Sequence, residues 1–235
     1  MADVRVFEDA AALARAAAEA VATAARLSFE ARGRFRLGLS GGRTPAPLYR
    51  ALAGPAFRER IPWPSVRIYF ADERAVPPSD PESNFRLAAE TLIGPARIPS
   101  ANVHRMKGDD PDLEAAVEEY ETLLAEPLDV LILGVGGDGH TASIFPGSPL
   151  VREVVRRVAL VTDAPKPPPR RITVTARAIG EARRVLVLAA GAEKAAAVAD
   201  ALEGGVEPRD VPARLLRDRE WYVDRAAAAR LARTG

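Results

Sequence analysis

Leu131-Ile-Leu-Gly-Val-Gly-Gly-Asp-Gly-His-Thr-Ala-Ser-Ile-Phe-Pro146 is an apolar run that breaks into a glycine-rich turn. The run predicts a buried strand over Val130 to Leu133, because it is short, continuous and bounded by glycine. The turn that follows carries one acid, Asp138, and one imidazole, His140. Open α/β sheets bind ligands in the loops that follow their strands, so this turn is the first candidate for a functional site.

Strands and helices alternate along the rest of the chain. Asp9 and Ser83 stand at N-cap positions, and Gly33 follows the last turn of a long alanine-rich helix. The expected strands are 4–7, 35–39, 66–70, 103–106, 130–133, 158–162, 170–175, 184–189 and 221–223, and the expected helices are 10–32, 46–53, 84–92, 112–124, 176–181, 195–202 and 225–233. This alternation predicts an α/β fold: a single domain over residues 1–235, with a mostly parallel, Rossmann-like sheet flanked by helices on both faces.

Composition excludes several classes of function. The chain has 235 residues, a net charge of +1 and no cysteine. The balanced charge favours neither nucleic acid nor a membrane as a partner, and the lack of cysteine excludes disulfides, thiolate metal sites and cysteine nucleophiles. No apolar run approaches membrane-spanning length, and the first residues lack the pattern of a signal peptide. We therefore expect a cytoplasmic protein whose partner is a small molecule.

Four loops with polar or basic residues follow predicted strands. In a parallel sheet, such loops gather at the carboxyl edge, where ligands bind. This placement predicts one shared site built from Ser40–Thr44, Asp72–Arg74, Gly134–His140 and Gly191–Lys194.

The first of these loops has the composition of an anion cradle. Its backbone N–H groups and the start of the next helix favour a phosphate, and two hydroxyls add further donors. The alternative is a tight strand-to-helix turn with no ligand, since short Ser-Gly-Gly loops are common. The candidate phosphate-binding residues are Ser40, Gly41, Gly42, Arg43 and Thr44.

Charged residues of the other loops suit the same ligand. Arg74 is a candidate for an oxyanion or phosphate, and Asp72 for sugar hydroxyls, although a surface ion pair explains both equally simply. Lys194, at a predicted helix start, can reach a phosphate as a point charge or can lie in solvent. Of Arg170 and Arg171, one is expected to point inward, and the sequence leaves open which.

His140 is the strongest candidate for proton transfer. A neutral imidazole can take a proton from water near pH 7, and Asp138 can bond to the ring or to a neighbouring group. A structural histidine is the alternative for His140, and we take the other histidine, His104, as structural. No spacing of His, Asp and Glu indicates a metal site. Ser143 lacks the surroundings of a nucleophile elbow.

The glycines of this turn also match G-x-G-x-x-G, the dinucleotide fingerprint, over 134–139. That motif needs a long helix directly after its third glycine. Pro146 and Gly147 interrupt the chain within two turns, so we reject a dinucleotide site.

At this level of detail the chain resembles the 6-phosphogluconolactonase family. The matching blocks, in order along the chain, are 39–45, 70–77 with 83–84, 133–146, 169–173 and 191–194. The resemblance implies a sugar-phosphate isomerase type of fold, hydrolysis of 6-phospho-glucono-δ-lactone in the oxidative pentose phosphate pathway, and no metal or organic cofactor.

The resemblance also implies a role for each candidate residue. His140 would be the general base that activates water, supported by Asp138. The phosphate would be held by the Ser40–Thr44 loop with Arg171 and Lys194, and the lactone end would be lined by Arg74 and Asp72. Arg43 departs from the serine that the family often has at this position, which should alter the rim of the cradle more than the chemistry.

Two other functions remain as alternatives. Glucosamine-6-phosphate deaminase/isomerase shares this kind of fold, but its blocks typically read Asp-Glu-Tyr and Phe-Asn-Glu-Pro, where this chain has Arg74 and Ser143-Ile-Phe-Pro146. A non-enzymatic sugar-phosphate-binding protein would need the cradle but not His140.

Overall fold

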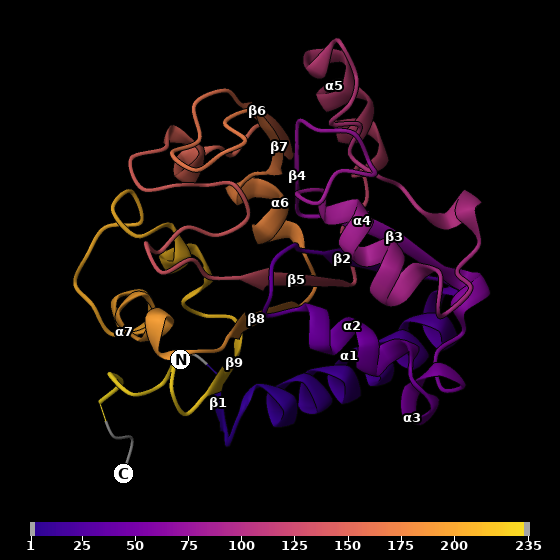
Figure 1. The fold of residues 1–235 in the computed structure, drawn as a ribbon, viewed down its shortest axis with the longest axis horizontal. Coiled ribbons are helices and arrows are strands. Elements are labelled where there is room, and N and C mark those ends of the chain that lie inside the picture. The colour runs from indigo at the N-terminus through magenta and orange to yellow at the C-terminus, as the bar shows by residue number, and fades with distance from the viewer. Residues whose placement is uncertain (1–2, 233–235) are drawn as a thin grey trace.

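A six-stranded, all-parallel sheet forms the centre of the protein (Figure 1). The computed structural model describes residues 3–232. The strands are, in spatial order, β1 (Asp3–Phe7), β9 (Glu220–Asp224), β8 (Val185–Ala189), β5 (Val130–Gly134), β2 (Phe35–Leu39) and β3 (Val66–Phe70). The predicted apolar run is β5, which lies buried between β8 and β2.

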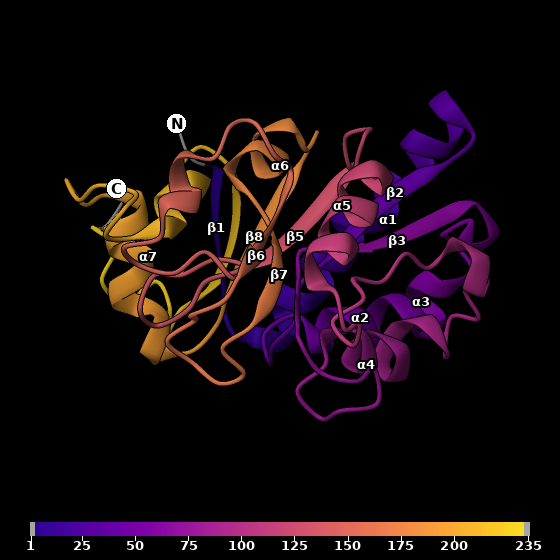
Figure 2. The same ribbon diagram turned by 90° about the horizontal axis from the view of Figure 1, so that it is seen from above.

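Helices cover both faces of the sheet, as predicted (Figures 1 and 2). Parallel crossovers are right-handed, so connections that run toward β3 and those that run toward β1 place their helices on opposite faces. One face carries α1 (Ala10–Arg32) and α2 (Ala46–Ala53), with the short α3 (Pro55–Arg58) and α4 (Asn84–Ala88) near α2. The other carries α5 (Leu113–Leu123), α6 (Ala176–Glu181) and α7 (Ala195–Leu202).

The long helix α1 illustrates how local sequence sets an element. The Asp9 carboxylate accepts a hydrogen bond from Ala12 N at 2.7 Å, which satisfies one free donor of the first turn. Gly33 ends the helix in the left-handed region, at φ 68°, and its N–H donates to Phe29 O at 2.8 Å. The buried side chains include Leu13 and Val21, which lie eight residues apart on one face.

A second, antiparallel sheet of three strands was not predicted. Its strands, in order, are β4 (Asp72–Arg74), β7 (Arg171–Val174) and β6 (Val158–Val161). The sequence placed Asp72–Arg74 in a loop, which is wrong: these residues pair with β7, Asp72 opposite Thr173. Three consecutive polar residues carry no strand periodicity, and their partner lies about a hundred residues away, so local pattern gave no signal.

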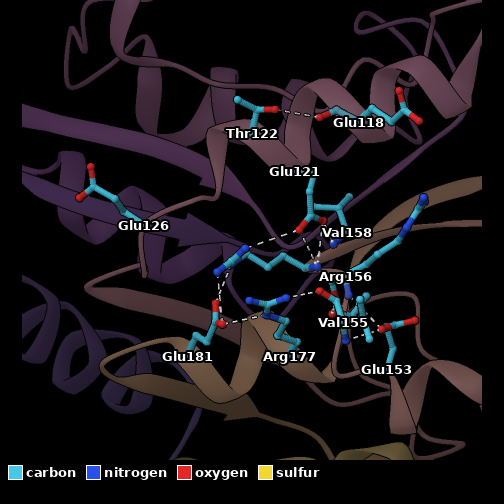
Figure 3. Close-up of polar contacts among 12 residues, drawn as sticks. Glu118, Glu121, Thr122, Glu126, Glu153, Val155, Arg156, Val158, Arg177 and Glu181 are labelled. Carbon is cyan, nitrogen blue, oxygen red and sulfur yellow. Dashed lines mark hydrogen bonds and ion pairs between the residues drawn. The ribbon is translucent and has the colours of Figure 1, made fainter.

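A charged network ties this second sheet to the neighbouring helices (Figure 3). Glu121, in the last turn of α5, accepts hydrogen bonds from the backbone N–H groups of Arg157 and Val158, both at 2.8 Å. Arg157 Nε donates to Glu181 of α6 at 2.6 Å, and Arg177 Nε donates to the same carboxylate at 2.9 Å. Glu121 therefore binds the backbone at the beginning of β6, and Glu181 links Arg157, next to that strand, to α6.

Two predicted elements are wrong. The expected strand 103–106 is a single bridge, Ile68 to Val103, because the next carbonyl, that of His104, accepts from the Tyr120 hydroxyl instead. The expected helix 225–233 forms only turns within its described part, 225–232. Backbone bonds there, such as Ala229 N to Ala226 O and Leu231 N to Ala228 O, join residues three apart and do not build the continuous i to i−4 series of an α-helix.

Candidate active site

A cleft of about 440 Å³ lies where β2, β5 and β8 end. It stands at a topological switch point, because the chain leaves β2 toward β3 and leaves the neighbouring β5 toward β8. The four predicted loops meet here. The cleft is lined by ten predicted residues, Ser40, Gly41, Gly42, Arg43, Thr44, Asp72, Arg74, His140, Arg171 and Lys194, with Asn84, Glu193 and Asp224 among the others.

The glycine-rich loop is held open as a cradle. The Tyr49 hydroxyl accepts from Ser40 N at 3.0 Å and donates to Ser40 O at 2.7 Å, and burial raises the pKa of this phenol. Gly42 has φ 97°, and a side chain at Gly41 would overlap the Asn84 amide. The buried Ser40 Oγ has no hydrogen-bond partner among the described residues. A polar atom without a partner, in the loop that leads from β2 to α2, suits a ligand from outside the chain.

The turn after β8 carries Lys194, which also lines the cleft. Burial lowers the pKa of this lysine. The Asp224 carboxylate accepts from Gly191 N at 3.0 Å and thereby holds the turn to the end of β9. Arg43 lies at the rim with a side chain 97% exposed, 4.0 Å from the Glu193 carboxylate.

Asp72 and Arg74 line the cleft in different ways. The buried Asp72 carboxylate accepts from Ser143 Oγ at 2.7 Å and from Asn84 Nδ2 at 3.0 Å, so both of its oxygens already join loops of the protein. Arg74 pairs with Glu82 at 3.6 Å, and its Nε is buried with no hydrogen-bond partner among the described residues. Arg74 therefore adds a guanidinium to the lining of the cleft, and the main contacts of Asp72 are with Ser143 and Asn84.

Glu73, between these two, is buried and holds the start of α4. Its carboxylate accepts from the backbone N–H groups of Asn84 and Phe85, each at 2.8 Å, and from Ser83 Oγ at 3.0 Å. Burial raises the pKa of Glu73, although these donors oppose the rise. A simple surface ion pair is thus the wrong description of the Asp-Glu-Arg triplet.

His140 and Asp138 form a direct pair in the turn after β5. Nδ1 of the imidazole contacts Asp138 Oδ1, which leaves Nε2 as the second ring nitrogen, and His140 lines the cleft. Asp138 itself does not line the cleft. Gly136 lies under the pair, and any side chain there would overlap both partners. The imidazole also packs on Phe145, with ring centroids 4.8 Å apart, so two contacts fix the plane of the ring.

Lys166 completes this group from the proline-rich loop before β7. Its Nζ lies 2.7 Å from Asp138 Oδ2 and 3.4 Å from His140 Nδ1. Burial alone would raise the pKa of Asp138, but hydrogen bonds from His140 and Lys166 outweigh burial and hold the pKa well below its ordinary value. Asp138 is therefore a carboxylate across the physiological range of pH.

Arg171, and not Arg170, lines the cleft. Arg170 is exposed, whereas the Arg171 side chain is buried, and burial and the nearby Arg74 lower its pKa. The Arg171 guanidinium donates to Pro168 O at 3.0 Å and to Lys166 O at 2.8 Å, and it lies 5.4 Å from the centre of the Phe145 ring. Arg171 thus holds the neighbouring proline-rich loop in place and also contributes a positive charge to the cleft.

Sequence reasoning missed three residues of the site: Asn84, Lys166 and Asp224. Asn84 bonds to Asp72, Lys166 to Asp138 and Asp224 to Gly191. None of these partners is a near neighbour in the sequence. Lys166 had one usable signal, because the chain has only three lysines and this one stands between prolines.

Metal-ligating side chains do not gather in groups of three or more anywhere in residues 3–232. Over the same residues, no helix has both the length and the apolar character needed to cross a membrane.

The site can now be set beside known proteins. The family model of glucosamine-6-phosphate isomerases/6-phosphogluconolactonase matches residues 8–223. The chain belongs to this family. A 6-phosphogluconolactonase of Mycobacterium tuberculosis is 41% identical to it, in a match that covers 97% of this chain and 98% of the relative.

Solved structures of the family share the whole fold. The 6-phosphogluconolactonase of Trypanosoma brucei superposes with a TM-score of 0.85 at 29% identity, over 99% of both chains. A monomeric glucosamine-6-phosphate deaminase superposes with a TM-score of 0.84 at 26% identity, over 97% of this chain and 99% of that one. Shape alone therefore does not separate the two activities within the family, and the residues of the cleft must do so.

Proposed function

We propose that the protein hydrolyses 6-phospho-D-glucono-1,5-lactone to 6-phospho-D-gluconate, with His140 as the general base. The observation that carries this proposal is the shared cleft: His140, with its Nδ1 held by Asp138, lines the same cavity as the glycine cradle with its unpartnered Ser40 hydroxyl. The 41% identity to a 6-phosphogluconolactonase supports it. The reaction belongs to the oxidative pentose phosphate pathway, and we propose that it takes place in the cytoplasm.

In this mechanism the phosphate is bound before the chemistry starts. The cradle and Lys194 hold it near the start of α2, and Arg171, which lines the same cleft, adds a further positive charge. Arg74, which also lines the cleft, would bind the lactone end through its guanidinium. Fixing the substrate at its phosphate converts the attack of water into an oriented, effectively unimolecular step.

The proton then moves through His140. The imidazole Nε2 takes a proton from water as the water oxygen bonds to the lactone carbonyl carbon, and cationic donors stabilise the developing oxyanion. The bond from this carbon to the ring oxygen breaks, and the imidazolium returns its proton to that oxygen. A positioned base accounts for about 10²–10⁴-fold of the acceleration, which is a large part of what a lactone that opens slowly by itself requires.

The deciding experiment compares two substrates on the purified protein. We expect opening of the lactone well above its spontaneous rate, and no release of ammonia from glucosamine 6-phosphate. The second activity is the relevant rival because a deaminase shares the fold. Ammonia release without lactonase activity would replace the proposal by the deaminase. Tight binding of 6-phosphogluconate without turnover of either substrate would favour a sugar-phosphate-binding protein.

A further inference from the structure

The loop that carries Lys166 is fixed without the help of the lysine side chain. Arg171 donates hydrogen bonds to the carbonyl groups of Lys166 and Pro168, and Ala164 N donates to Pro169 O at 2.9 Å. Pro165 precedes Lys166 and another proline follows it, which restricts the backbone further. These bonds fix the backbone from which the Lys166 side chain extends, and removing the ammonium group leaves them intact.

The Lys166 ammonium lies beside the His140 and Asp138 pair and binds the carboxylate oxygen that the imidazole does not contact, called here the outer oxygen. Each carboxylate oxygen of Asp138 has its own partner: Oδ1 contacts the imidazole, and Oδ2 lies 2.7 Å from Lys166 Nζ. The ammonium also lies 3.4 Å from His140 Nδ1. The lysine side chain is 48% exposed, so its contribution is moderated by solvent but not removed.

The Lys166 ammonium offsets an unfavourable effect of the Asp138 carboxylate on the proposed base, His140. A carboxylate against an imidazole favours the protonated ring, and a protonated ring cannot accept a proton from water. Other charges around the ring are Lys194 and Glu193 on the turn after β8, and Arg171, which faces it across Phe145. Among residues 3–232, the Lys166 ammonium alone contacts the carboxylate and the ring together, as a positive charge that opposes protonation of the imidazole.

We propose that Lys166 is a positioning residue for the reaction: its ammonium binds the outer oxygen of Asp138 and places a positive charge beside Nδ1 of His140, with Nε2 left for water. This role rests on the proposed lactonase function. It differs from that of Lys194, which contacts the substrate phosphate in our mechanism and so acts mainly on KM.

The test replaces Lys166 by methionine, which keeps the length of the side chain and removes its charge. In K166M, we expect the acid side of the kcat/KM profile to move to higher pH by about one unit. KM should change by less than about twofold, because no substrate contact is lost. K166R keeps a positive charge and should recover at least half of the shift. The matched control is K107M, since Lys107 pairs with Glu119 outside the cleft and its loss should leave the profile unchanged.

A second measurement does not depend on turnover. The chain has two histidines, so the ¹⁵N resonances of the His140 ring can be assigned with an H104N variant and followed through a pH titration. In K166M, protonation of the ring should shift to higher pH by the same amount as the activity profile. Superimposable ring titrations of K166M and the unmodified protein, or K166R behaving as K166M does, would overturn the role of Lys166. If the unmodified protein lacks lactonase activity but the ring titration shifts in K166M, the proposed function fails and the electrostatic role of Lys166 stands.

Discussion

At the scale of single residues, His140 has one nitrogen held by protein and one left for chemistry. The variant H140A removes the proposed base but none of the groups that hold phosphate. We expect kcat to fall by about 10²–10⁴-fold, with KM within about threefold of its original value. Steady-state kinetics on the lactone measure both, and binding of 6-phosphogluconate by calorimetry confirms an intact cleft. Unchanged turnover would exclude His140 as the base.

Lys194 should show the opposite kinetic pattern. It lines the wall that faces the glycine cradle, and its charge reaches the substrate only through the phosphate in our mechanism. K194M should raise KM by roughly tenfold and change kcat less, since a hydrogen bond to a charged group contributes about 1.5–3 kcal/mol. K107M is the control, because Lys107 pairs with Glu119 outside the cleft and should leave KM unchanged. A fall in kcat at constant KM would contradict phosphate binding by Lys194.

The candidate site could be predicted from sequence wherever the signal was local. Gly41 and Gly42 were predicted because glycines before a helix have a known use, and His140 because it follows a buried strand among glycines. Lys166 and Asp224 escaped, since each acts on a residue that folding alone brings near. The choice of Arg171 over Arg170 also needed the structure, because it depends on how β7 pairs with β4 and β6.

At the scale of secondary-structure elements, one buried acid attaches helix α4 to the second sheet. E73A would leave three backbone N–H groups, those of Arg74, Asn84 and Phe85, and the Ser83 hydroxyl without this acceptor. We expect a loss of about 1–3 kcal/mol in the free energy of unfolding for such unpaired buried donors. Urea denaturation measures this loss. E90A is the control on the same segment, because Glu90 forms an exposed pair with Arg86 and should matter little.

The predicted elements succeeded where apolar periodicity was strong. The strands β2 and β3 and the helices α2 and α6 have the predicted bounds. The polar strand β4 was missed for the converse reason, since its three residues are held by pairing with β7 and by Glu73. Local pattern therefore recovered the main sheet and most helices, and long-range pairing built the second sheet.

At the scale of the whole molecule, stability should depend on pH through His104. Its ring is stacked on Tyr69, and its Nε2 is buried with no hydrogen-bond partner among the described residues. Burial lowers the pKa of His104 below 6.5, and the charges of Arg67 and Arg36 lower it further. Between that lowered pKa and 6.5, the unfolded chain binds the extra proton, so the free energy of unfolding decreases as pH falls below about 6.5.

The variant H104F tests this dependence. It keeps an aromatic ring against Tyr69 and removes the titrating group. The free energy of unfolding from urea curves, measured from pH 7.5 to 5, should fall less steeply for H104F than for the unmodified protein. Equal slopes over this range would show that His104 does not control the acid stability. Above pH 7 the two curves should run parallel, because His104 is then neutral in both states.

The position of β9 between β1 and β8 has a consequence for synthesis. Of the described strands, β1 leaves the ribosome before all the others, yet its partner within the main sheet is β9, which leaves after all of them. The first strand must therefore remain unpaired while nearly all the intervening chain is made. The same last strand brings Asp224 to the turn that carries Lys194. The nascent protein therefore cannot hold the turn that carries Lys194 through Asp224 until β9 has been made and has joined the sheet between β1 and β8.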